Sequence, residues 1–137
     1  MAPEEPFVDE VDEPDPELNR VTNSIIGAAI EVHRELGPGY LESNYENAME
    51  IEFRRRGISF ARQVDVFVMY KGQQVGKGTI DFIVEGKVLV ELKAVDALAP
   101  VHTAQVIAYL KATGLRLGLL LNFNVRVLRE GIKRIAR

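Results

Sequence analysis

The 137-residue sequence contains no cysteine and only two histidines, His33 and His102. Without cysteine the chain has no structural disulfide, no thiolate zinc site and no cysteine nucleophile, and two histidines exclude a three-histidine metal site. No apolar run approaches the roughly 20 residues that a membrane-spanning helix needs. The first residues are acidic, unlike those of a signal or transit peptide. We therefore expect a cytoplasmic protein with no membrane segment.

Charge is distributed unevenly along the chain. Residues 1–20 carry eight acidic residues and one arginine, whereas the rest carries 16 basic and 12 acidic residues. From Lys111 onward there are seven basic residues and a single acid, Glu130. This pattern predicts an acidic flexible arm at residues 1–15 and a mildly basic domain at residues 16–137. The basic C-terminal region is compatible with a polyanion surface and equally with a solvated basic end.

Hydrophobic periodicity and turn residues predict the elements of the domain. Asp15-Pro16 is typical of a helix start, and Gly37-Pro38-Gly39 ends that helix. The predicted elements in chain order are a helix over 16–36, a helix over 41–56, strands over 64–69, 75–84 and 88–93, a helix from Pro100 that ends at Gly114, a strand over 117–122, and a short hairpin or edge strand over 125–135. This order indicates an α/β domain with a mixed sheet.

Two consecutive predicted strands carry the charges of greatest interest. If residues 85–87 form a hairpin loop, Val84 pairs with Val88, and Asp81 then faces Glu91 about 5 Å away at Cβ. Two carboxylates this close repel each other unless a proton or a cation lies between them. Hard oxygen ligands favour Mg²⁺ or Mn²⁺, so the pairing predicts a site for one of these cations.

Side-chain alternation adds two expectations about the same strands. Ile80, Phe82 and Val84 share one face, with the aspartate on the opposite face. In the next strand Lys93 lies on the same face as the glutamate, so its ammonium would lie beside the cation. Ordinary surface ion pairing is the alternative. The remaining residues of that strand are apolar, which favours the end of a buried strand, where α/β sheets build their sites.

Helical residues add to this set. Glu42 lies in the first turn of its predicted helix, and Gln105 and Tyr109 are four residues apart and so share a face. Each has an ordinary interpretation when taken alone: a carboxylate favoured by the helix dipole, or a helix surface with a core tyrosine. His102, one turn before Gln105, would either contact phosphate or line the helix start.

Together these residues resemble the PD-(D/E)xK nuclease superfamily. More narrowly, the chain resembles the bacterial GxxExxY proteins, whose motif is matched by Gly39, Glu42 and Tyr45. The resemblance extends over roughly residues 21–135 and leaves the acidic arm outside. It implies a restriction-endonuclease-like core, which is a central mixed β-sheet flanked by helices.

The resemblance also implies roles for single residues. The catalytic set it implies is Glu42, Asp81, Glu91, Lys93, Gln105 and Tyr109. The residues implied to hold Mg²⁺ or Mn²⁺ are Asp81, Glu91, Leu92 through its main-chain carbonyl, Glu42 and His33. Lys93 would orient the attacking water or offset negative charge, and Gln105 with Tyr109 resembles the Q-x-x-x-Y element of RecB-like exonucleases. For His33 the alternative is an ordinary helix-packing residue.

These roles predict a metal-dependent nuclease that hydrolyses phosphodiester bonds, with DNA favoured as its substrate. The alternative is a non-catalytic nucleic-acid-binding or protein-binding module, because a nuclease fold does not by itself grant activity. A third hypothesis makes the acidic arm an internal polyanion mimic that covers the basic surface. We expect a homodimer if both strands of a duplex are cut.

Overall fold

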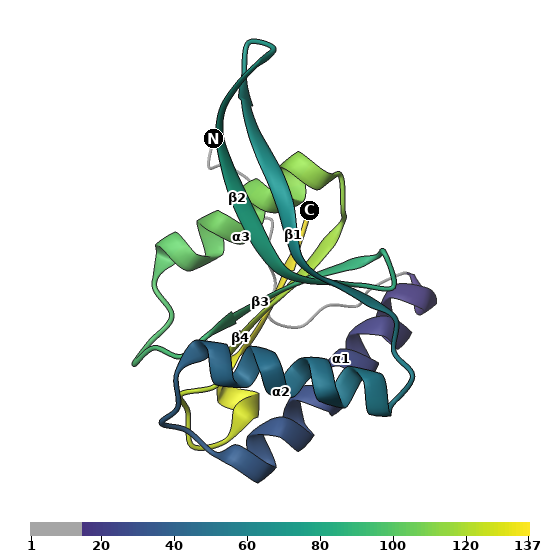
Figure 1. Ribbon diagram of the computed structural model, residues 1–137, viewed down its shortest axis with the longest axis vertical. Coiled ribbons are helices and arrows are strands. Elements are labelled where there is room, and N and C mark those ends of the chain that lie inside the picture. Colours follow the sequence, from purple (N-terminus) through teal and green to yellow (C-terminus); the bar gives the residue numbers. More distant parts are fainter. Residues whose placement is uncertain (1–14) are drawn as a thin grey trace.

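The computed structural model describes residues 15–137, which form a five-stranded mixed sheet and three α-helices (Figure 1). The predicted α/β architecture is therefore confirmed. The acidic arm, apart from Asp15, lies outside the described residues. The elements in chain order are α1 (Pro16–Leu36), α2 (Glu42–Arg55), β1 (Phe60–Tyr70), β2 (Gln73–Val84), β3 (Val88–Lys93), α3 (Pro100–Thr113), β4 (Leu117–Asn122), the 3₁₀ turn η1 (Leu128–Gly131) and β5 (Ile132–Ala136).

The strands lie side by side in chain order, from β1 at one edge to β5 at the other. β3 and β4 are parallel, and the other three pairs are antiparallel. A parallel pair needs a crossover connection, which α3 supplies between β3 and β4. Every residue of β4 is buried, which agrees with its apolar sequence without alternation.

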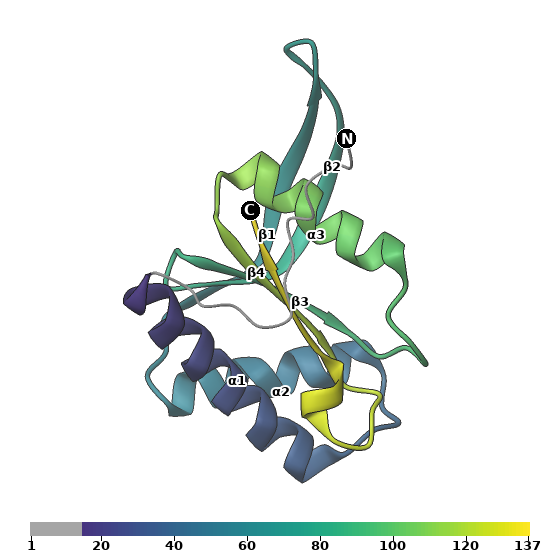
Figure 2. The same cartoon turned by 180° about the vertical axis from the view of Figure 1, so that it is seen from behind.

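Helices cover both faces of the sheet (Figure 2). α1 and α2 pack on one face against residues that include Val90 and Leu119. α3 packs on the other face against residues that include Leu89 and Leu120. Each fully buried side chain of this kind stabilises the fold by roughly 1.5–3 kcal/mol. Neighbouring residues of β3 and β4 thus contribute to two separate hydrophobic clusters.

The ends of the helices are fixed by local chemistry. Asp15 Oδ1 accepts hydrogen bonds from the main-chain N–H groups of Glu17 (2.9 Å) and Leu18 (3.3 Å), which caps α1 as the sequence predicts. Gly114 ends α3 with φ +78°, a conformation that favours glycine. Among residues 15–137, no helix combines the length and the apolar character needed to cross a membrane.

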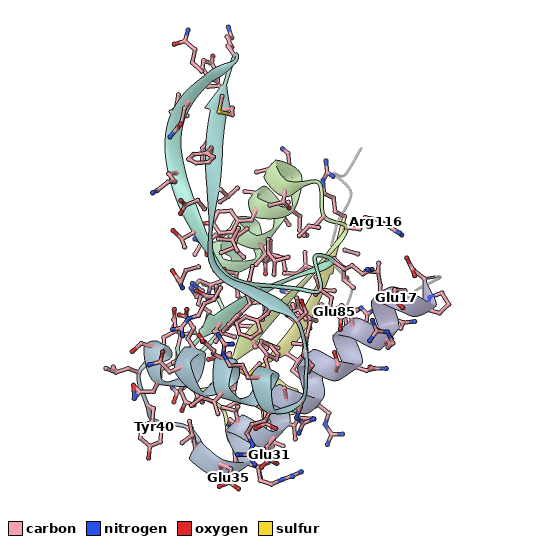
Figure 3. All side chains as sticks on the ribbon, turned by 45° about the vertical axis from the view of Figure 1, so that its right-hand side comes forward. Glu17, Glu31, Glu35, Tyr40, Glu85 and Arg116 are labelled. Carbon is pink, nitrogen blue, oxygen red and sulfur yellow. The ribbon has the colours of Figure 1, made fainter. Side chains whose placement is uncertain are left out.

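The turn between β2 and β3 is tied to α1 by one arginine. Arg20 Nη2 lies 2.7 Å from Glu17 Oε2 on the same helix and 2.8 Å from Glu85 Oε1 in the turn (Figure 3). These ion pairs are exposed, so each contributes little to stability. The Arg20–Glu85 pair links the turn between β2 and β3 to the first part of α1.

The C-terminal region differs in part from the prediction of a hairpin or edge strand over 125–135. β5 is an edge strand, but η1 precedes it and no hairpin forms within this segment. Gly131 packs against the main-chain carbonyl of Asn122 so closely that a Cβ atom would overlap it. The turn therefore folds directly onto the end of β4, which leaves no room for a second strand there.

The β1–β2 hairpin projects beyond the rest of the sheet (Figure 1). β3 pairs only with the last residues of β2, from Phe82 to Val84, so most of the hairpin is two-stranded. Its far part, which extends away from the helices in Figure 3, carries exposed apolar side chains. They are Phe67, Val68, Met69, Tyr70 and Val75. A two-stranded hairpin of this kind is only marginally stable without a partner.

Candidate active site

β2 and β3 separate beside two acidic residues. Their ladder pairs Val84 with Val88, as the hairpin loop predicts, and ends before Asp81 and Glu91 are reached. There the main-chain N–H of Asp81 donates to Glu91 Oε2 at 2.8 Å, and the N–H of Leu92 donates to Asp81 Oδ2 at 2.8 Å. The two carboxylates thus replace main-chain carbonyls as acceptors, and they hold the sheet open at this point.

Both carboxyl groups are difficult to ionise. Burial and the adjacent Asp81 raise the pKa of Glu91 to about 8, and its side chain is almost fully enclosed. Burial also raises the pKa of Asp81 to about 6, although the hydrogen bond from the Leu92 N–H opposes this shift. The negative charges of Glu46 and Glu42 raise the pKa of Asp81 further. An acid pair of this type holds a proton or a cation between its members at neutral pH.

Lys93 and Leu92 complete this end of β3. The positive charge of Lys93 lowers the pKa of both acids, so its ammonium acts on the site electrostatically. The main-chain carbonyl of Lys93 accepts a hydrogen bond from the N–H of Phe123 at 2.9 Å, which links the end of β3 to the segment after β4. The N–H of Leu92 points toward Asp81 in β2. In a β-strand, the N–H and the carbonyl of one residue point toward the same adjacent strand. The Leu92 carbonyl therefore faces the opening between β2 and β3.

The expectation that Ile80, Phe82 and Val84 share one face is wrong. Phe82 and Val84 pack in the cluster under α1 and α2, whereas Ile80 packs in the cluster under α3. Side-chain alternation therefore reverses at Asp81. The reason is local, because Gln63 in the neighbouring strand has φ +55° and interrupts the ladder opposite Asp81. Alternation predicted from sequence assumes a regular backbone, which is absent here.

The Gly39, Glu42 and Tyr45 motif organises the start of α2. Tyr45 Oη donates to the carbonyl of Gly37 at 2.6 Å and accepts from the N–H of Tyr40 at 3.2 Å. The tyrosine thereby fixes the loop that leads into Glu42. Glu42 itself is exposed, and its charge raises the pKa of both site acids. The structure thus places Glu42 within electrostatic range of the acid pair.

His33 has a partner of its own away from the acid pair. Its Nε2 atom lies 2.8 Å from the carbonyl of Val125, and its ring centroid lies 6.3 Å from that of Phe123. Among residues 15–137, no hydrogen bond or ion pair links His33 to either acid. These contacts agree with the helix-packing alternative, and the role of His33 as a metal ligand stays a prediction.

α3 brings Gln105 and Tyr109 to the side of β2. Gln105 Nε2 lies 3.4 Å from Tyr109 Oη, so the two side chains share a helix face. Tyr109 covers Gly78, where a Cβ atom would lie only 2.5 Å from the tyrosine oxygen. His102 Nδ1 accepts from the N–H of Ala99 at 2.9 Å, so this histidine lines the helix start. The hydrogen bonds described for residues 15–137 do not extend from these side chains to the acid pair.

Sequence reasoning missed Glu46 and Gln63. Glu46 is only 9% exposed, and its Oε2 atom accepts from Arg62 Nε at 2.7 Å and from Gln63 Nε2 at 2.6 Å. Gln63 Nε2 also lies 3.4 Å from Asp81 Oδ1. Glu46 follows Glu42 by one helical turn, so the shared helix face was the available signal. Nothing in the sequence indicates the left-handed backbone of Gln63.

The donor set at the opening fits a hard divalent cation. Two carboxylates and the Leu92 carbonyl present oxygen atoms, the ligand type that Mg²⁺ and Mn²⁺ prefer. Within residues 15–137, no three histidine or acidic side chains are already grouped as a metal site. Mg²⁺ commonly uses one or two carboxylates and keeps several waters, so two carboxylates are sufficient.

Fold and site together define a restriction-endonuclease-like α/β domain with paired carboxylates where its sheet opens. The sequence model described as PD-(D/E)XK nuclease superfamily matches residues 19–135, which is nearly all of the described domain. The chain therefore belongs to the PD-(D/E)XK nuclease superfamily. No curated protein matches the chain.

Proposed function

We propose that this chain is a metal-dependent nuclease that hydrolyses phosphodiester bonds at the opening between β2 and β3. The observation that carries the proposal is the pair formed by the half-buried Asp81 and the buried Glu91, each hydrogen-bonded to the main chain of the opposite strand, with Lys93 on the same strand as the glutamate. Membership of the nuclease superfamily supports the same activity.

Each residue of the site has a separate task in this proposal. Asp81, Glu91 and the Leu92 carbonyl would hold a divalent cation, which would supply Lewis acidity toward the phosphate and the attacking water. Lys93 orients that water or offsets the negative charge that develops on the phosphate. Glu42, at the N-terminus of α2, adds a further carboxylate at the rim of the site.

The finer parts of the proposal rest on resemblance and on residue chemistry. DNA is the proposed substrate, because Gln105 and Tyr109 resemble the Q-x-x-x-Y element of RecB-like exonucleases. Mg²⁺ or Mn²⁺ is the proposed cation, because all the candidate ligands at the opening are oxygen atoms. Assignment to the GxxExxY proteins is proposed on Gly39, Glu42 and Tyr45.

A homodimer is proposed for cutting both strands of a duplex, with the projecting hairpin as the contact surface. The hairpin exposes a contiguous run of large apolar side chains from Phe67 to Tyr70. β1 is also an edge strand of the sheet, which leaves its main-chain groups open for antiparallel pairing with a second copy. A two-fold interface of this type would be self-complementary.

A second candidate function is nucleic-acid binding without cleavage. A cavity of about 510 Å³ lies between the end of α1 and the segment after β4, and Arg34, Arg126 and Arg129 line it. Guanidinium groups suit phosphate recognition whether or not the bound strand is cut. Binding of nucleic acid that weakens steeply with salt and is never followed by cleavage would favour this function.

The proposal is tested by incubating purified protein with labelled single- and double-stranded DNA and RNA in Mg²⁺ or Mn²⁺. Lys93→Ala is the active-site variant, and Lys87→Ala, in the exposed turn between β2 and β3, is the matched control. We expect wild type and Lys87→Ala to cut at the same rate and Lys93→Ala to lose at least about 100-fold. Equal cleavage by all three proteins would contradict the site assignment.

A further inference from the structure

β1 has an unusual conformation where it passes the site. Gln63 has φ +55°, in the left-handed region that residues other than glycine rarely adopt. The β1–β2 ladder continues on both sides of this point, at Arg62 and at Val64, and skips Gln63 and Asp81 between them. The other irregularity of the ladder, a register shift between Val68 and Met69, lies farther along the hairpin. The distortion is therefore confined to the residue that faces the site aspartate. Backbone strain confined in this way is typical of functional sites.

At the distortion, the side chains of both strands exchange the faces of the sheet on which they pack. Phe60 packs under α1 and α2, whereas Val64 packs under α3, and β2 makes the same exchange between Phe82 and Ile80. A regular strand would keep these alternate residues on one face. The buried side chains of the hairpin therefore lie on opposite faces of the sheet before and after Gln63. The Gln63 side chain itself contacts Glu46 on α2.

The amide of Gln63 joins two carboxylates. Its Nε2 atom donates to Glu46 Oε2 at 2.6 Å and lies 3.4 Å from Asp81 Oδ1. The reverse orientation would set the amide oxygen against two carboxylate oxygens, so the nitrogen must face them. Glu46 is buried on α2 and is held in turn by Arg62 Nε at 2.7 Å. A continuous chain of contacts therefore runs from α2 through Gln63 to the site aspartate.

We propose that Gln63 is a positioning residue that orients the Asp81 carboxylate for cation binding, an inference that rests on the proposed function. The Leu92 N–H donates to Oδ2 of Asp81 at 2.8 Å and the Gln63 amide lies 3.4 Å from Oδ1, so each carboxylate oxygen has a partner that favours one orientation of the group. The remaining lone pairs then face the opening shared with Glu91. Outer partners of this kind set the orientation of a ligand without contacting the metal.

The decisive variant is Gln63→Gly, because glycine accepts the left-handed backbone and removes the side chain that carries the amide. We expect its unfolding midpoint to equal or exceed that of wild type. Its Mn²⁺ affinity in calorimetric titration should fall about 10- to 100-fold. Its kcat should fall by a similar factor, while KM for nucleic acid stays unchanged. Lys71→Gly is the matched control, because Lys71 also has positive φ (+50°) but lies at the hairpin turn, and it should leave the Mn²⁺ affinity, kcat and KM unchanged.

Gln63→Asn provides a second test that keeps an amide. Asparagine tolerates the left-handed region, but its side chain is one methylene shorter and cannot span both carboxylates. It should fold like wild type and lose Mn²⁺ affinity like Gln63→Gly. The inference is overturned if either folded variant binds Mn²⁺ and cuts as wild type does, or if activity merely follows stability. If the wild-type protein neither binds Mn²⁺ nor cuts nucleic acid, that result contradicts the proposed function itself rather than the role of Gln63.

Discussion

Replacing Glu91 by glutamine should stabilise the metal-free protein at alkaline pH. The substitution removes the charge and keeps an oxygen that can accept from the Asp81 N–H, which the wild-type carboxylate binds at 2.8 Å. The new amide nitrogen can donate to the adjacent carboxylate. The variant therefore retains the packing of a buried side chain while it removes the repulsion between two acids.

The pH dependence follows from the raised pKa of Glu91. Burial and the adjacent acid move it from 4.5 to about 8, so the folded protein keeps a proton that the unfolded chain releases. The free energy of unfolding therefore falls as the pH rises between those two values and levels off above them. At about 1.4 kcal/mol per pKa unit, the full effect is on the order of 3–5 kcal/mol. Because titration is shared with Asp81, we expect Glu91→Gln to recover about 2–4 kcal/mol at pH 8.5 and little at pH 4.5.

The assay is guanidinium denaturation in the presence of a chelator, for wild type and Glu91→Gln, at both pH values. Added Mg²⁺ should stabilise wild type more at pH 8.5 than at pH 4.5, because the cation competes with protons for the carboxylates. It should leave Glu91→Gln nearly unchanged. Wild-type stability that rises with pH across this range, or an identical pH dependence in the variant, would refute the reasoning.

The remaining predictions concern packing and assembly. Gly78→Ala should destabilise the fold by about 1–3 kcal/mol in denaturant titration, because its Cβ would lie 2.5 Å from Tyr109 Oη. Gly76→Ala is its control, with its nearest contact at 3.8 Å, and a similar loss there would count against the packing argument. Tyr70→Ser combined with Val75→Ser should convert a dimer into a monomer in light scattering. An unchanged mass would exclude the hairpin as the dimer contact.

The pairing of the site acids could be predicted because it depends on one short loop. Once residues 85–87 connect two strands, the register follows by counting, and Asp81 comes close to Glu91 although the ladder itself ends at Phe82 and Val90. The start of α1 could be predicted for a similar reason, since Asp15 and Pro16 act on their immediate neighbours. Features fixed by a few adjacent residues are therefore accessible from sequence.

Features that depend on tertiary contacts could not be predicted in this way. Gln63 adopts a left-handed backbone that its residue type does not favour, and the reversed packing of Ile80 follows from it. The sequence likewise points to Glu42 rather than Glu46, because only folding shows which of the two faces Arg62 and becomes buried. Both omissions concern residues that a distant element holds in place.

The central claim is that Asp81 and Glu91 form one divalent-cation site. Calorimetric titration of Mn²⁺ into the metal-free protein at pH 8.5 tests it most directly, with Asp81→Asn as the site variant. Asp65→Asn is the control, because Asp65 is an exposed strand aspartate paired with Lys77 at 3.8 Å. We predict Mn²⁺ binding by wild type and Asp65→Asn and an affinity at least about tenfold lower for Asp81→Asn. Equal affinity in all three proteins, or no binding by wild type, would contradict the account.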